Sequence, residues 1–121
     1  MITKASIIIP NWNGLDLLKD CLQSLEKQSY KDFEIIMVDN GSTDNSLEYV
    51  KKNFPQVKIK NLSKNFGFAK AINEGVKTSG GQHVVFLNND TSVDRDWLKN
   101  LIKCADDHPE VISVNSKLLN F

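Results

Sequence analysis

The chain has little of what several large classes of protein require. Lysine plus arginine and aspartate plus glutamate number 15 each, so no basic surplus points to nucleic acid or an anionic membrane surface. No apolar run approaches the roughly 18 residues that span a bilayer, and the N-terminus lacks the layout of a signal peptide. We therefore expect a cytoplasmic protein without a transmembrane segment in this chain. A place at the inner face of the membrane is compatible with this for the full-length protein.

Cysteine, proline and glycine are also scarce. The two cysteines, Cys21 and Cys104, belong to no CxxC or Cys/His pattern. Both fall in segments of helical apolar periodicity, which predicts buried free thiols in a reducing compartment rather than a disulfide. No repeat, linker or low-complexity stretch divides the chain. With 121 residues, 40% of them hydrophobic, we expect 1–121 to form a single domain.

What the chain does contain is an alternation of strand-like and helix-like segments. Apolar and β-branched runs predict strands over 5–10, 33–38, 57–62, 83–87 and 111–114. Apolar residues three and four apart predict a helix over 15–28, a second that Ser42 or Thr43 caps and that ends before Pro55, a third from Phe68 that stops at Ser79, and a fourth that Asp94 caps and that ends before Pro109. This order predicts an α/β fold, a doubly wound and mostly parallel sheet in three α/β/α layers.

The run from Val84 to Leu87 stops abruptly on Asn88-Asn89-Asp90. Consecutive apolar residues predict a strand buried on both faces, whereas the alternating segment 57–62 suits a half-exposed edge. Ligands of open α/β sheets bind at the carboxyl ends of the strands. Asp90 is therefore placed to hold a hard cation against phosphates, the alternative being an Asx turn that caps the next segment.

Polar clusters also follow the other strands, at 10–14, 39–42 and 65–70. Parallel strands end at one edge of a sheet, so we expect these clusters to converge. Ordinary turn chemistry explains any one of them. Trp12 is harder to explain by a turn, because an indole there suits stacking on a heterocyclic base, although it also suits partly buried packing.

Four stretches in register resemble successive signatures of family 2 glycosyltransferases. They read SIIIPNWNG at 6–14, VDNGSTDNS at 38–46, NFGFAKAINEG at 65–75 and FLNNDT at 86–91. Within this family, the sequence is most similar to the rhamnosyltransferase-like branch, where the metal motif often reads Asn-Asn-Asp. The resemblance implies a GT-A, Rossmann-like fold and an inverting enzyme that uses a nucleotide-diphosphate sugar, here a UDP- or dTDP-sugar, in polysaccharide biosynthesis.

The resemblance also implies roles for residues of the first two clusters. Pro10 and Asn11 would line the nucleoside pocket, and Trp12 would stack on the base. Asp39 and Asn40 match an acidic pair that reads the pyrimidine edge and supports the pocket. Asn40 departs from the commoner Asp-Asp, but its amide still offers an acceptor and a donor for this readout.

The remaining two motifs would face the diphosphate. Asn65, Gly67 and Lys70 would approach the nucleoside and diphosphate, with a solvated helix lysine as the alternative for Lys70. Asn89 would contribute a neutral carbonyl or orient a water molecule. Asp90 would anchor Mg²⁺ or Mn²⁺, for which one carboxylate suffices when phosphates and waters complete the octahedron.

No residue presents itself as the general base that inverting transfer requires. In the family this carboxylate lies farther along the chain, so we expect it beyond residue 121 and expect 1–121 to be the N-terminal donor-binding part, with little or no transfer activity of its own. The acceptor would be a glycan or a lipid-linked sugar, and an exposed sheet edge invites a homo-oligomer. Two alternatives stay open: a non-catalytic nucleotide- or carbohydrate-binding module, and a phosphoacceptor receiver domain. The latter lacks its acidic pair, since 10–13 reads Pro-Asn-Trp-Asn.

Overall fold

A computed structural model describes residues 2–119 as four parallel strands and four helices. The strands are β1 (Ala5–Asn11), β2 (Phe33–Asp39), β3 (Lys58–Asn61) and β4 (His83–Phe86). The helices are α1 (Leu15–Glu26), α2 (Ser46–Asn53), α3 (Phe68–Thr78) and α4 (Trp97–Asp107). The strand order β3-β2-β1-β4, with every pair parallel, confirms the predicted doubly wound α/β sheet. None of these helices is both long and apolar enough to cross a membrane.

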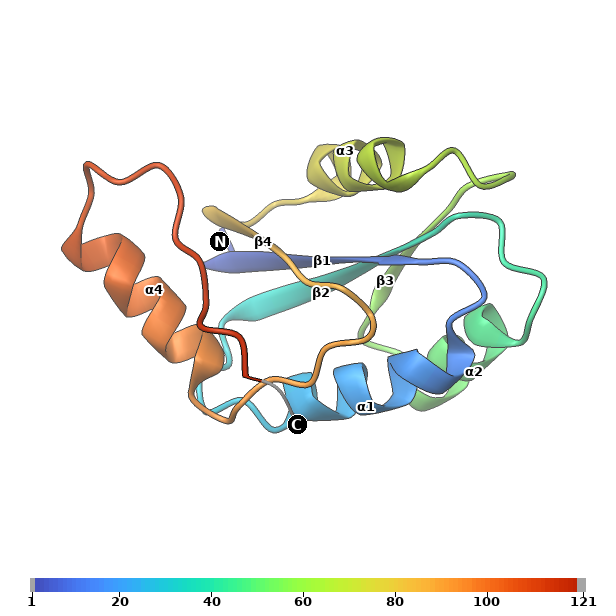
Figure 1. Ribbon diagram of the computed structural model, residues 1–121, viewed down its shortest axis with the longest axis horizontal. Coiled ribbons are helices and arrows are strands. Elements are labelled where there is room, and N and C mark those ends of the chain that lie inside the picture. Colours follow the sequence, from blue (N-terminus) through green and yellow to red (C-terminus); the bar gives the residue numbers. More distant parts are fainter. Residues whose placement is uncertain (1, 120–121) are drawn as a thin grey trace.

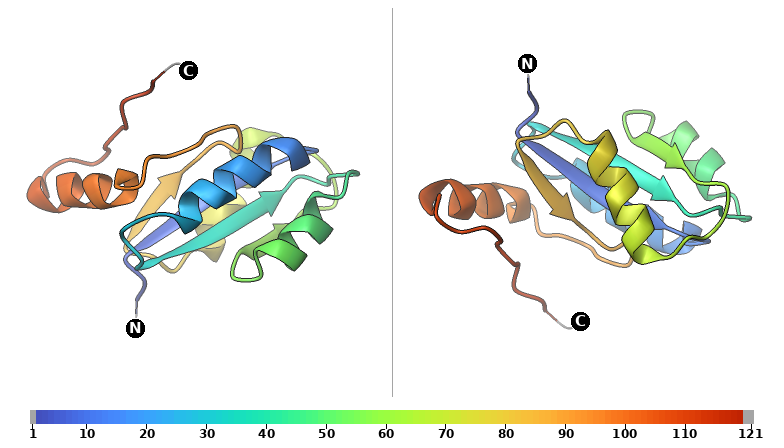
Figure 2. Two further views of the ribbon diagram at one scale, coloured as in Figure 1. Left: turned by 90° about the horizontal axis from the view of Figure 1, so that it is seen from below. Right: turned by 90° about the horizontal axis from the view of Figure 1, so that it is seen from above.

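The sheet forms the middle layer, and its two faces are covered by different helices (Figure 1). Side chains of a strand alternate between faces. Ile7 and Ile9 of β1 therefore pack with α1, α2 and α4 in one core cluster, while Ile8 packs with Ala71 of α3 in another. Figure 2 shows α1 and α2 on one face and α3 across the other. The two central strands, β1 and β2, are therefore covered on both faces.

A glycine brings α3 close to the sheet. A Cβ at Gly75 would lie 2.5 Å from Cγ2 of Ile8 and 3.1 Å from Cγ2 of Val38, closer than side chains in a core approach each other. The absent side chain lets the helix backbone lie directly over β1 and β2. The first turn of α3 is thereby brought next to the carboxyl ends of these strands.

The strand β4 differs from its prediction. It lies at an edge of the sheet, and Val84 and Phe86 are 37% and 56% exposed. The expected burial on both faces is wrong because α3 packs over β1 and β2 and leaves the outer strand uncovered. A run of apolar residues is found both in central strands covered on two faces and in edge strands such as β4, so it does not distinguish the two. The other edge strand, β3, lies where its alternating pattern predicts.

The predicted strand over 111–114 is also absent, because residues 111–119 contain neither helix nor strand. Ile112 is fully exposed there, and no neighbouring strand pairs with the segment. Cys104 is exposed on α4, whereas Cys21 is buried, so only one of the two free thiols follows the expectation.

The predicted helix caps are wrong for α2 and α4. Helix α2 begins only at Ser46, and Ser42 instead donates to the Asp39 carboxylate at 2.7 Å. Helix α4 begins at Trp97 after Asp96, while Asp94 accepts a hydrogen bond from the Asp96 backbone at 3.2 Å. In both places the polar side chain closes the preceding turn rather than the helix terminus.

Candidate functional site

The carboxyl ends of the strands form one polar edge. Asn11 and Asp39 are paired in register as the last residues of β1 and β2, and Asp39 is likewise paired with Asn61 of β3. The loops that follow β1, β2 and β3 gather at this end of the sheet (Figure 1). The strand order reverses between β1 and β4, and such a switch point is where doubly wound sheets bind ligands.

Asn11 joins three segments at this edge. Its Nδ2 donates to Oδ1 of Asp39 at 3.0 Å, and its Oδ1 accepts a hydrogen bond from Nδ2 of Asn89 at 2.9 Å. A Cβ at Gly14 would lie 2.3 Å from Nδ2 of Asn89 and 2.5 Å from Oδ1 of Asn11, so the glycine permits this approach. The structure thus brings three of the predicted site residues into direct contact.

The Asp39 carboxylate is buried and well supplied with donors. Besides Asn11, the backbone N–H of Ser42 donates at 2.8 Å and the Ser42 hydroxyl at 2.7 Å. No salt bridge to Asp39 forms among residues 2–119. A carboxylate accepts about four hydrogen bonds. Three donors therefore compensate much of the cost of burial and leave the carboxylate with acceptor capacity.

Asn13, which was not among the predicted site residues, joins the loop after β1 to the loop after β2. It adopts the left-handed region, with φ of 47°, and its Oδ1 accepts hydrogen bonds from the backbone N–H groups of Thr43 at 2.7 Å and Asp44 at 3.2 Å. The backbone N–H of Asn13 donates to the Ser42 hydroxyl at 2.9 Å. The available signal is the Asn-Gly dipeptide at 13–14, since asparagine tolerates this backbone conformation. Asn13 fastens the loop after β1 to the loop after β2.

Asp44 strengthens the same connection. Its carboxylate accepts hydrogen bonds from the backbone of Leu15 at 3.2 Å and of Ser46 at 3.0 Å, at the starts of α1 and α2. Burial works to raise the pKa of this carboxyl, but these hydrogen bonds outweigh it and hold the pKa below its usual range. The charged form of Asp44 thus stabilises both helix starts.

Trp12 stands on this braced loop with 54% of its surface exposed. The ring is thus about half exposed, and the packing alternative stays open beside base stacking. Pro10 lies two residues earlier, half-buried and paired with Val38. Part of the indole is therefore accessible from solvent at the polar edge of the sheet.

Asp90 is exposed after β4, next to the half-buried Asn89. Burial, with a smaller contribution from the nearby Asp90 charge, raises the pKa of the Cys21 thiol to about 12. Within residues 2–119 no three His, Cys, Asp or Glu side chains are grouped to hold a metal ion. At this edge Asp90 is thus an exposed carboxylate, and a cation bound there would need further oxygens from a ligand or from water.

The loop before α3 carries the last predicted residues. Oδ1 of Asn65 accepts a hydrogen bond from the backbone of Gly67 at 2.8 Å, and Gly67 has φ of 90° directly before the helix. Lys70 is exposed and pairs with Glu74 at 3.3 Å. Hydrogen bonds from Lys77 and Lys70 hold the pKa of the Glu74 carboxyl below its usual range. The structure thus places Lys70 on the helix surface, as the solvated-lysine alternative describes.

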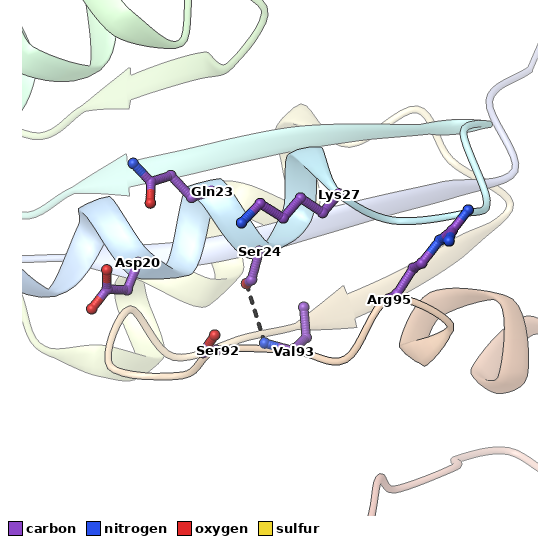
Figure 3. A pocket seen from close by; sticks show the side chains of 7 residues that line it. All are labelled: Asp20, Gln23, Ser24, Lys27, Ser92, Val93 and Arg95. Carbon is purple, nitrogen blue, oxygen red and sulfur yellow. Dashed lines mark hydrogen bonds between the residues drawn. The ribbon is translucent and has the colours of Figure 1, made fainter.

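A separate hollow of about 370 Å³ lies between α1 and the segment after Asp90 (Figure 3). The Ser24 hydroxyl accepts a hydrogen bond from the backbone of Val93 at 3.1 Å. The charged ends of Lys27 and Arg95 point away from each other in Figure 3, so they do not converge on one ligand. We assign this hollow a structural role, because the bond to Ser24 holds the segment that follows Asp90.

The strand order and the polar edge define a Rossmann-like α/β domain. The chain belongs to glycosyl transferase family 2, because that family's model matches residues 6–117. This membership confirms the resemblance to family 2 glycosyltransferases. It rules out the alternative that the chain is a phosphoacceptor receiver domain.

Two curated relatives are glycosyltransferases. The uncharacterized glycosyltransferase YibD of Escherichia coli is 38% identical over 93 residues, which are 74% of this chain and 27% of the relative. The poly(ribitol-phosphate) beta-N-acetylglucosaminyltransferase TarS of Staphylococcus aureus is 32% identical over 123 residues, covering 97% of this chain and 22% of TarS. The chain thus spans only a quarter or less of the TarS length and about a quarter of YibD.

Two solved structures have the same fold. Residues 1–349 of S. aureus TarS in complex with UDP-GlcNAc give a TM-score of 0.81 at 32% identity, covering 88% of this chain and 32% of that one. The mannosyltransferase PcManGT of Pyrobaculum calidifontis, in complex with GDP-Man and Mn²⁺, gives 0.77 at 25% identity, covering 87% and 33%. These likenesses confirm the predicted GT-A, Rossmann-like architecture.

Proposed function

We propose that this chain is the donor-binding part of a glycosyltransferase that transfers a sugar with inversion from a UDP- or dTDP-sugar to a glycan or lipid-linked acceptor. The observation that carries the proposal is the contact of Asn11 with Asp39 and Asn89, which joins three strand ends at the switch point of the sheet. The structural neighbours were solved with UDP-GlcNAc, or with GDP-Man and Mn²⁺, which supports a nucleotide-sugar ligand for this chain.

The nucleoside would occupy the crevice between Trp12 and the loop of Asn65 and Gly67. The exposed indole offers its face to the base, and stacking of this kind tolerates any base. Pro10 and Asn11 would form the adjoining wall. Asp39, with its remaining acceptor capacity, would support the floor beneath the base.

Asp90 would hold Mg²⁺ or Mn²⁺, and Asn89 would assist with a neutral oxygen or an oriented water molecule. Bound at this place, the cation supplies electrostatic stabilisation of the nucleotide-diphosphate leaving group. The exposure of Asp90 leaves its oxygens accessible, while the bond from Asn89 to Asn11 fixes the preceding backbone relative to the crevice.

Among residues 2–119, the acids at the polar edge are engaged in hydrogen bonds, apart from exposed Asp90. We therefore propose that the general base is supplied by chain outside 1–121, and that this domain alone shows weak or no transfer. The competing class, a non-catalytic binding module, predicts ligand binding without transfer even in the full-length protein. An assay of the full-length protein with a radiolabelled donor distinguishes the two.

Titration of the chain with UDP, with and without Mn²⁺, tests the proposed function. We expect saturable binding by calorimetry that is stronger in Mn²⁺, because the cation links the diphosphate to Asp90. Mg²⁺ in place of Mn²⁺ should also strengthen the binding of UDP. Absence of UDP binding in both metals, with the protein folded by circular dichroism, contradicts the proposal.

The free edge of β4 supports the expected homo-oligomer. Val84 and Phe86 are apolar and exposed on a strand that carries no charge within 84–86, a composition that favours pairing with a second copy. We expect concentration-dependent self-association by light scattering, reduced by Val84→Lys. The matched variant Leu17→Lys, at an exposed apolar residue of α1, should have a smaller effect. An unchanged monomer at high concentration contradicts this expectation.

A further inference from the structure

We infer that Asn40 is a positioning residue, which fixes the loop before α3 as a preformed wall of the crevice, rather than a residue that reads the base with its amide. This loop comprises residues 63–67 and is named the β3–α3 loop. Its consequence for ligand binding rests on the proposed function, whereas its structural part does not.

Both polar ends of the Asn40 amide are engaged by this loop. Nδ2 donates to the carbonyl oxygen of Gly67 at 3.3 Å, and Oδ1 accepts a hydrogen bond from the backbone of Phe66 at 3.3 Å. Asn40 is itself buried, and its backbone N–H donates to the carbonyl oxygen of Asn11 at 2.8 Å. The amide is therefore held from both sides by the loop, and with only 5% of its surface exposed its orientation is set by these bonds.

The neighbouring Gly41 forms a second attachment. Gly41 has φ of 75°, and a Cβ built there would lie 2.6 Å from Cα of Lys64. The loop backbone thus rests directly on the turn after β2 at a position where a side chain does not fit. Asn40 and Gly41 together hold both halves of the β3–α3 loop.

Little else holds this loop. Its residues from Ser63 to Gly67 are all exposed, and the Phe66 ring contacts the Lys64 ammonium group within the loop itself, at 5.2 Å from the ring centroid. Between residues 2 and 119, its hydrogen bonds to the sheet edge both come from Asn40. Loops with few buried contacts open easily, so the two bonds decide its order.

The chemistry of position 40 requires an amide. An aspartate still accepts the bond from Phe66, but it has no donor for the Gly67 carbonyl and places a negative oxygen against it. That carbonyl also accepts a hydrogen bond from Ala71, at 3.3 Å, as the first bond of α3. The amide therefore links β2 to the start of the helix as well as to the loop.

The isosteric change Asn40→Asp tests this inference, with Asn61→Asp as the matched control. Asn61 is exposed at the end of the adjacent strand, where the same change adds the same charge away from these bonds. In the ligand-free protein we expect hydrogen exchange of a peptide covering 63–68 to accelerate about tenfold in Asn40→Asp, because a lost bond and a repulsive contact act together. In Asn61→Asp it should remain as in the parent chain. Asn40→Ala, which removes both bonds without adding charge, serves if the aspartate variant does not fold.

UDP affinity in Mn²⁺ should fall by about tenfold in the same variants, because the loop must then be ordered on binding. Exchange at 63–68 that is unchanged in folded Asn40 variants overturns the positioning role. Faster exchange with unchanged UDP affinity overturns the loop's part in the binding wall. Failure of the parent chain to bind UDP, with exchange altered as expected, contradicts the proposed function and leaves the positioning role supported.

Discussion

Replacing Asp90 by alanine is expected to remove the dependence of UDP binding on Mn²⁺. The residue is the exposed carboxylate that follows β4, and within residues 2–119 no cluster of three acidic, histidine or cysteine ligands exists to replace it. We expect affinity in Mn²⁺ to fall by about tenfold or more, since even the loss of a group that supports a metal ligand has effects of this size. Affinity measured in EDTA should change little.

The control is Asp94→Ala, which removes the next acidic residue along the chain. The Asp94 carboxylate accepts a hydrogen bond from the backbone of Asp96, and among residues 2–119 no hydrogen bond joins it to the polar edge. Calorimetry of the two variants in Mn²⁺, Mg²⁺ and EDTA separates a metal contact from a general loss of negative charge. Full Mn²⁺ dependence in Asp90→Ala assigns the cation to other groups and refutes the role given to Asp90.

The second large effect is expected from Trp12→Ala. The indole is more than half exposed on a loop held by Asn13, so its removal should leave the folded state intact while the base loses its stacking partner. Loss of one aromatic–base stack weakens binding by about 1–3 kcal/mol. We expect the UDP dissociation constant to rise accordingly, with Trp12→Phe retaining most of the affinity.

Fluorescence offers a second measurement of the same contact. The chain has two tryptophans, and Trp97 lies on α4 with its Nε1 bonded to the Ser116 hydroxyl at 2.8 Å. In a Trp97→Phe background, UDP should quench the remaining emission if the base covers the Trp12 ring. Equal UDP affinity of the alanine and parent chains excludes the stacking role.

The sequence predicts much of this architecture because its local patterns agree with the tertiary arrangement. Strands β1, β2 and β3 and the core face of α1 follow the apolar pattern of the sequence, and the polar clusters meet because parallel strands share one carboxyl edge. The convergence of Asn11, Asp39 and Asn89 follows from topology alone. Their hydrogen-bond partners do not, because each amide has several possible partners and only the packed loops select among them.

The predictions that the structure contradicts share one physical cause. Apolar composition reports what a segment is able to bury, whereas the rest of the fold decides what covers it. Phe86 belongs to a strand with a neighbour on one side only, and Val111 belongs to a segment that pairs with no strand in the described chain. From the sequence alone, the amide of Asn40 suits hydrogen bonding to a base. That it instead bonds to the β3–α3 loop is visible only in the folded structure.

The contact between Asn89 and Asn11 spans 78 residues of sequence. Closing such a long loop is entropically costly, and distant pairings of this kind slow folding. The crevice therefore does not exist in a nascent chain until β4 and the asparagines after it have left the ribosome and docked on β1. Nucleotide binding would act on the complete fold and not on an early fragment of it, so it would raise the free energy of unfolding by an amount that grows with the logarithm of the nucleotide concentration.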